Sequence, residues 1–448
     1  MNVNSVEMVN AVLIIFLLFL MTRHSNAKTV LLVLFLYGTL HFSFSIATLY
    51  LDNYTDQWAK LHTNGGGVLA EVSAFLLLCC AFVLLSRYAH EQFLLSPRKV
   101  KKIIAFLGLV MVAVFCGYLF NIRFGDWTQL KNVISIESLL LLLLIGPLAL
   151  GNNKQSLSAV KFYSWSLLGL ILFAIVDCIA IYEVFSHRSW AGTFQSSGIM
   201  VYRASSVLFN PNLLGFWASI AYLGCAYGMY QYKEHRKVMI CGMVLASTAI
   251  YFSGSRSTGY TLLVMMFIST ALIKERLRWV PLMVLPVSVL SVYGITSQLI
   301  IPFVTSKEGW YAIVYLGDRL FATPAQIFGY IGMVAGYSEL GAPIEIVQSI
   351  EGRFKGEDLD SGWISLYNDI GWFGMVSIIL MSIAGLWWGV KIFLAERSTA
   401  SVFALTTLCY CLLIGVAMRY QVFPIWLFVG VALTPCLAFW MRVSISDT

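Results

Sequence analysis

Long apolar runs constrain this chain more than any other feature of its sequence. A helix needs about 20 mostly apolar residues to cross the hydrocarbon core of a bilayer, and thirteen runs of roughly that length can be read along the chain. They lie at about 8–22, 29–50, 66–86, 103–121, 133–150, 162–184, 207–229, 238–253, 259–273, 280–302, 368–390, 399–417 and 422–441. The sequence therefore predicts an all-α fold, a polytopic transmembrane helical bundle of about 12–14 spans.

The composition excludes most other classes of protein. Only 11% of the 448 residues are charged and 59% are hydrophobic, whereas a soluble domain carries about 25% charged residues. A disordered chain, a disulfide scaffold and a coiled coil are excluded on the same ground. The net charge of +7 would suggest a nucleic-acid partner in a soluble protein, but here it reflects loop charges that orient the chain in a membrane. No nucleic-acid partner is expected.

The loop at 87–102 predicts the orientation of the bundle. It carries Arg87, Arg98, Lys99, Lys101 and Lys102, and short loops rich in Lys and Arg remain in the cytoplasm. Alternate connections counted from this loop hold eighteen of the 29 Lys and Arg residues. We therefore expect the amino terminus outside and the carboxyl terminus inside.

One connection is much longer than the others. Residues 303–367 form a charged outer loop of about 65 residues, and long loops in compact proteins are usually functional or disordered. We expect four parts: amino-terminal transmembrane helices at 1–160, transmembrane helices with two arginine motifs at 161–302, the outer loop at 303–367, and carboxyl-terminal transmembrane helices at 368–448.

The cysteines and histidines do not form a recognisable metal-binding pattern. All nine Cys fall within apolar runs, and the six His are scattered without HxxxH spacing. Zinc sites need such paired spacings. Neither a metal nor another cofactor is expected.

Two arginines at the outer ends of predicted spans are candidate anion-binding residues. Arg203 precedes the span at 207–229, and Arg256 lies in the turn before 259–273. A guanidinium group offers a planar fork suited to phosphate oxygens, although an arginine at a helix end often extends to lipid headgroups instead. Asn212 and its neighbours favour the first interpretation, because Asn210-Pro211-Asn212 exposes backbone amides where a helix begins.

A third polar segment, GEDLDSGWISLYNDIGWFG, ends the long loop. Glu357, Asp358 and Asp360 lie there directly before the span at 368–390. A carboxylate at this position suits general-base catalysis, but Asp360 or Ser361 is equally suited to capping the helix that follows. Both interpretations stay open on spacing alone.

These three segments, in this order, resemble the O-antigen ligase and O-antigen polymerase superfamily. The likeness rests on R…F-N-P-N-L-L-G, the S-R-S turn and D-S-G-W-I…N-D-I-G-W-F-G, and it covers roughly residues 160–440. It implies a metal-independent glycosyltransferase of the bacterial inner membrane, a multi-pass protein whose long loop and active site face the periplasm. The implied partners are an undecaprenyl-diphosphate-linked glycan donor and acceptor, membrane lipids and, as an open point, a chain-length regulator.

The resemblance also implies roles for individual residues. Arg203, Arg256 and Asn212 would bind the donor diphosphate. Asp360 is the first choice for the base that activates the incoming hydroxyl, followed by Glu357 and Asp358. Two further sets are secondary candidates: Arg353, Arg319 and Arg419 for a second carrier's phosphate, and Tyr202 and Trp363 for a surface that binds sugars.

One departure from the superfamily favours a polymerase over a ligase. Ligases of this group place a His eleven residues before the first Gly of a G-x-x-G pair, and here Asp360 occupies that position relative to Gly371. We therefore expect polymerisation of O-antigen or related surface polysaccharide. The alternatives are ligation of the glycan to lipid A core or protein, and a lipid-linked oligosaccharide flippase. The sequence leaves open the sugars, the linkage, the stereochemistry and the oligomeric state.

Overall fold

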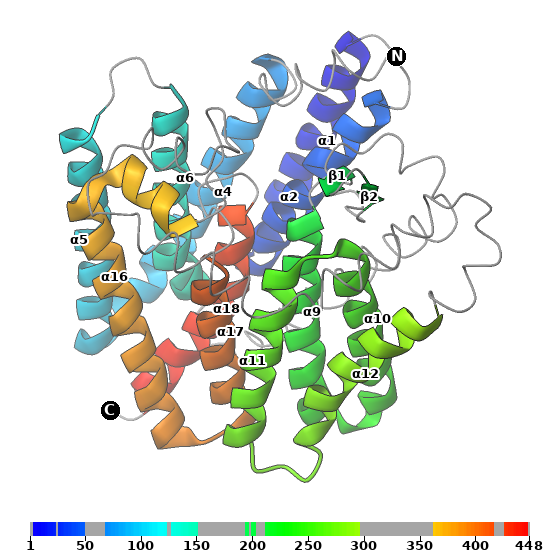
Figure 1. The fold of residues 1–448 in the computed structure, drawn as a ribbon. Helices are drawn as coiled ribbons and strands as arrows, with labels where there is room; N and C mark the ends of the chain where they lie inside the picture. The colour runs from blue at the N-terminus through cyan, green and yellow to red at the C-terminus, as the bar shows by residue number, and fades with distance from the viewer. Residues whose placement is uncertain are drawn as a thin grey trace.

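A computed structural model describes residues 3–23, 26–49, 68–122, 127–150, 193–196, 199–202, 211–295, 362–415 and 425–446. These residues form a bundle of helices with one short antiparallel hairpin (Figure 1). The helices are α1 (Val3–Arg23), α2 (Ala27–Leu49), α4 (Val68–Leu95), α5 (Arg98–Phe120), α6 (Trp127–Leu150), α9 (Pro211–Gln231), η3 (Lys233–His235), α10 (Arg236–Ser253), α11 (Arg256–Leu272), α12 (Trp279–Ile295), α16 (Gly362–Glu396), α17 (Thr399–Ile414) and α18 (Ile425–Ser446).

The predicted apolar runs coincide with these helices. Every run that falls within the described ranges holds one α-helix, and the run at 162–184 lies outside them. Five helices in the described part are long and apolar enough to cross a membrane: Arg98–Phe120, Gln129–Leu150, Asn212–Gln231, Asp369–Glu396 and Ile425–Ser444. The helical fold is thereby confirmed and these five helices are candidate membrane spans, whereas the number of spans stays a prediction.

The helices divide into a buried centre and an apolar flank. The apolar windows of α9 and α18 are each 89% buried, whereas those of α5 and α16 are only 22% and 17% buried. The outward face of α16 is nevertheless apolar, with exposed Trp372, Phe373, Val376, Ile379, Leu380, Ile383, Trp387, Val390 and Leu394. Apolar surface costs about 25 cal/mol per Å² in water, so this flank is suited to lipid.

An aromatic cluster joins distant parts of the chain at the centre. Trp217 of α9 lies 3.8 Å from Phe428 of α18 and 5.3 Å from Phe35 of α2, measured between ring centroids. Phe216, the neighbour of Trp217, stacks on Tyr410 of α17 at 5.9 Å. Helices from both halves of the sequence therefore share one core.

Glycines set the closest helix contacts. Gly117 of α5 lies against α16, where a Cβ at position 117 would collide with the Ile370 carbonyl oxygen and lie 2.7 Å from the Gly374 nitrogen. A Cβ at Gly146 of α6 would similarly lie 2.9 Å from the Thr434 side chain of α18. Small residues allow such approach, and in a bilayer close packing replaces the hydrophobic effect as the force between helices.

The bundle has a basic end, which holds the carboxyl ends of α16 and α18 and the amino end of α5. Gly117 near the end of α5 contacts the beginning of α16, so these two helices run antiparallel, while Gly389 of α16 packs on Trp440 of α18. Their termini at this end carry basic residues, namely Arg98, Lys99, Lys101 and Lys102 of α5, Lys391 of α16 and Arg442 of α18. The candidate site lies at the other end, called here the opposite end.

Two local features differ from the expectation. Thr193–Ser196 and Ile199–Tyr202 form the paired strands β1 and β2, in a connection between two predicted spans for which no strand was predicted. The signal was a Ser-Gly pair between two short runs rich in β-branched and aromatic residues. In addition, α16 begins at Gly362, six residues before the predicted span at 368, because a separate short helix precedes the long one.

Substitution of Gly117 should weaken the contact between α5 and α16. In Gly117→Ala the new methyl group would meet backbone atoms that cannot rotate away, and overpacking typically costs about 1–3 kcal/mol. Thermal unfolding of the purified protein in detergent measures this loss. Gly108→Ala on the same helix is the control, because no atom lies within 4 Å of its added Cβ. Equal stability of the two variants would contradict the proposed contact.

Candidate functional site

The turn that carries Arg256 has a defined geometry at the opposite end. Gly254 ends α10 with φ 57°, a left-handed conformation that suits glycine. Ser255 is extended and precedes α11, whose first residue is Arg256. The Ser253 side chain accepts a hydrogen bond from the Ser255 nitrogen at 3.2 Å, and the Thr258 hydroxyl donates to the Ser255 carbonyl at 2.9 Å. These bonds fix the turn and thus the backbone position of Arg256.

The first turns of α9 pack directly against this turn. A Cβ at Gly215 would lie 2.5 Å from Thr258 Oγ1, 2.9 Å from Ser255 Cβ and 3.0 Å from Ser253 Oγ. Asn212 lies three residues earlier on the same helix. Gly215 therefore brings two motifs, separated by about 40 residues in the sequence, into contact.

Two helix amino termini consequently meet at this place. α9 begins at Pro211, a residue suited to the first helical position, and α11 begins at Arg256. The amino-terminal end of a helix carries a partial positive charge that favours anions. Ser255 adds a buried hydroxyl oxygen that has no hydrogen-bond partner among the described residues. The local field and these groups suit a negatively charged ligand.

The third segment forms a broken helix at the start of α16. Gly371 has φ 63° and ψ −178°, a combination that essentially only glycine adopts. Residues 362–370 therefore form a short helix of their own, the half-helix, which runs obliquely to the long remainder of α16 (Figure 1). Gly374 has a different role, because its nitrogen and Cα face Gly117 of α5.

Gln129 of α6 holds the end of the half-helix in place. Its side-chain nitrogen donates to the Asp369 carbonyl at 3.0 Å and to the Asn121 carbonyl at 2.9 Å. A helix end leaves carbonyl groups without intrahelical partners, and Gln129 satisfies one of them at the break. Gln129 is 2% exposed and Asp369 is 7% exposed. Neither residue was singled out from the sequence, since a lone amide and an acid at the edge of a run carry no spacing signal.

Trp363 is partly buried and connects the beginning of the half-helix to α17. Its indole nitrogen donates to the Leu412 carbonyl of α17 at 3.3 Å, and its backbone nitrogen donates to the Gly415 carbonyl at 3.2 Å. The ring forms part of the wall of an apolar cavity among the helices. Trp363 therefore anchors the beginning of the half-helix to α17, and a sugar-binding role for it stays a prediction.

Most of the predicted site residues cannot be placed. Tyr202 ends β2, where it pairs with Thr193, and Asn212 and Arg256 lie in the first turns of α9 and α11. The remaining candidates fall outside the described residues: Arg203, Arg319, Arg353, Glu357, Asp358, Asp360 and Arg419. Asp360 precedes the first residue of the half-helix by two positions.

Acidic and metal-binding side chains are sparse within the described ranges. Across those ranges, no three His, Cys, Asp or Glu residues lie close enough together to hold a metal ion. Glu137 of α6 has a buried Oε1 atom without a hydrogen-bond partner among the described residues. We find no further group around Glu137 that defines a site.

Comparison with known protein families, with characterised proteins and with solved structures finds no match for this chain.

The contact at Gly215 should tolerate no side chain. Gly215→Ala places a methyl group against three side chains of the Arg256 turn, so we expect a loss of about 1–3 kcal/mol in the free energy of unfolding. Gly228→Ala on the same helix is the matched control, because its Cβ would meet only Met239, whose flexible side chain can move. Thermal unfolding in detergent compares the two, and an equal loss would contradict a specific contact at Gly215.

Proposed function

We propose that this protein is a glycosyltransferase that polymerises lipid-linked oligosaccharide repeat units on the outer face of a bacterial inner membrane. The observation that carries the proposal is the contact at Gly215. This contact joins the Asn212 segment to the Arg256 turn at the opposite end of the bundle. A diphosphate donor needs a fixed cationic site at one membrane face. The positive ends of α9 and α11 supply a suitable place for it.

The chemistry requires two kinds of group. The acceptor hydroxyl attacks the anomeric carbon of the donor sugar while the bond from that carbon to the diphosphate oxygen breaks. Negative charge grows on the leaving diphosphate, and fixed cations stabilise that transition state. In this proposal Arg203 and Arg256 fill that role, with Asn212 as a further donor. The hydroxyl proton passes to a carboxylate, for which Asp360 is the first candidate, ahead of Glu357 and Asp358.

The half-helix supports the placement of the acidic group. It begins two residues after Asp360 and is fixed at both of its ends, by Trp363 to α17 and by Gln129 to α6. A base must be held within hydrogen-bond reach of its substrate. A short helix that is anchored to two neighbouring helices is a suitable rigid support for the acidic segment that precedes it. Arg319, Arg353 and Arg419 remain candidates for the phosphate of the acceptor carrier.

The glycan profile of a deletion strain tests the reaction. Loss of long chains, with single repeat units still delivered to the surface, is the expected result. Long chains that remain on the lipid carrier would instead indicate a ligase. Carrier-linked repeat units trapped inside the cell would indicate a flippase. Complementation with the wild-type gene controls for effects on neighbouring genes.

The two arginines should be essential for chain growth. Arg203→Ala and Arg256→Ala should each lower the yield of long-chain polymer at least 100-fold at normal protein levels. A fixed cation at a leaving group is worth roughly 3–4 kcal/mol. Lysine variants should recover little activity, since a point charge does not replace a planar fork. Gel analysis of the glycan measures chain length.

Lys131 provides a matched comparison for this experiment. It is an exposed basic residue on α6, outside the proposed site, so Lys131→Ala should leave chain length unchanged. Full activity of either arginine variant would contradict the proposed role of the two arginines in binding the donor diphosphate.

Asp360→Asn should separate catalysis from helix capping. Asparagine caps helices about as well as aspartate, so the variant should keep its stability. Its polymerisation rate should fall by roughly 100-fold or more, as the loss of a general base requires. In vitro turnover of lipid-linked repeat units and thermal unfolding are measured on the same preparation. A near-normal rate would return Asp360 to a capping role.

A further inference from the structure

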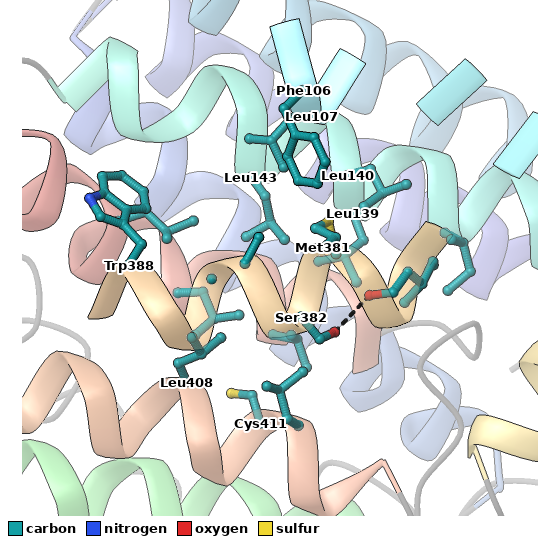
Figure 2. A pocket seen from close by; sticks show the side chains of 18 of the residues that line it. Phe106, Leu107, Leu139, Leu140, Leu143, Met381, Ser382, Trp388, Leu408 and Cys411 are labelled. Carbon is teal, nitrogen blue, oxygen red and sulfur yellow. Dashed lines mark hydrogen bonds between the residues drawn. The ribbon is translucent and has the colours of Figure 1, made fainter. Parts of the chain in front are cut away.

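An apolar cavity of about 190 Å³ lies among α5, α6, α16, α17 and α18. Figure 2 shows Leu139, Leu140 and Leu143 of α6 on one side of it and Met381, Trp388 and Leu408 around the rest. The half-helix closes one end with Trp363 and Leu366. The cavity is therefore lined by helices from distant parts of the sequence.

The wall, as far as the structure describes it, is almost entirely apolar. Ser382 directs its hydroxyl to the Ile378 carbonyl of its own helix at 2.8 Å (Figure 2). The Trp388 indole nitrogen donates to Ser444 Oγ at 3.1 Å, and that of Trp363 donates to the Leu412 carbonyl. These donors are engaged with the protein, so the rings present carbon atoms to the space. Such a cavity excludes water and accepts apolar molecules.

The cavity reaches the lipid-facing flank of the bundle. Two of its lining residues are exposed at the surface, Phe106 of α5 and Ala384 of α16. Both belong to helices that are long and apolar enough to span a membrane. In a bilayer these two residues would face hydrocarbon, which would give a lipid chain a lateral path to the cavity.

Basic side chains stand beside the opening at the basic end. On α5, Lys102 lies four residues before Phe106 and Lys99 four residues before Ile103, so each shares a face with a lining residue. On α16, Lys391 lies three residues after Trp388 and shares its face in the same way. All three lysines are exposed. Basic clusters beside gaps between transmembrane helices bind anionic lipid headgroups.

We propose that this cavity and these lysines form a binding site for one anionic phospholipid. One acyl chain fills the cavity, and the headgroup phosphate lies among Lys99, Lys102 and Lys391. The volume suits part of one chain, roughly six to eight carbon atoms, because an apolar cavity of about 150 Å³ holds one benzene molecule. The proposed headgroup site is at the basic end, and the proposal does not depend on the proposed glycosyltransferase activity.

Retention of lipid by the purified protein tests the site. The full chain is extracted in mild detergent and mixed with equal amounts of phosphatidylglycerol and phosphatidylethanolamine, each with a photoreactive acyl chain. After illumination, mass spectrometry locates the labelled residues. We expect at least fivefold more label from phosphatidylglycerol, located on lining residues such as Met381 and Trp388.

Two kinds of variant separate the chain from the headgroup. Gly385→Leu fills the cavity, and its Cβ makes only ordinary contact, 3.6 Å from Leu408. It should reduce the label at least fivefold, whereas Gly108→Leu, which projects into open space, should not. Lys102→Gln combined with Lys391→Gln should remove the preference for phosphatidylglycerol, and the same exchange at Lys237 and Lys274 should leave it intact.

Several results would overturn the proposal. The first is an unchanged amount of label in Gly385→Leu, and the second is an equal amount of label from both lipids. The third is labelling of the lining residues only by a photoreactive polyprenyl phosphate that is added in the same way. The lysine pair leaves the cavity wall untouched, so it keeps the test informative if Gly385→Leu fails to fold.

Discussion

Close packing at small residues is the interaction on which this bundle depends. Within a bilayer, lipid tails solvate apolar side chains as well as other helices do, so helices associate through tight contact rather than through the hydrophobic effect. Gly117 and Gly374 allow α5 and α16 to touch along their backbones, and Gly215 allows α9 to meet the α10–α11 turn. Each of these contacts also positions a segment of the candidate site. The same packing therefore holds the fold together and determines the arrangement of polar groups at the opposite end.

Much of the fold could be predicted from hydropathy alone. Apolar runs predicted the helices because a segment in a bilayer must satisfy its backbone hydrogen bonds internally, which leaves the helix as the available form for runs of this kind. Hydropathy carries no information about a break within a run, so the half-helix before Gly371 was missed. It was also silent on the β1–β2 hairpin, whose strands are only four residues each.

The candidate site was predictable in part. The sequence singled out the Asn212 segment and the Arg256 turn, and the structure brings those two segments into contact. Gly215, the residue that makes this contact possible, was noted only as the last residue of a motif. A distance between two helices cannot be read from a single sequence. Gln129 was not predictable for the same reason, since its partners at Asn121 and Asp369 are chosen by tertiary packing. The positions of Arg203 and Asp360 stay predictions.

The attachment of the half-helix has a mechanical consequence. Its beginning is tied to α17 and its end to α6, while the glycine break next to it lies against α5. Three helices thus hold the half-helix in its position. Helices tilt when the thickness of the surrounding bilayer changes, and a tilt of any of the three would rotate the half-helix. Lipid composition can in this way change the orientation of the half-helix without any ligand in the site.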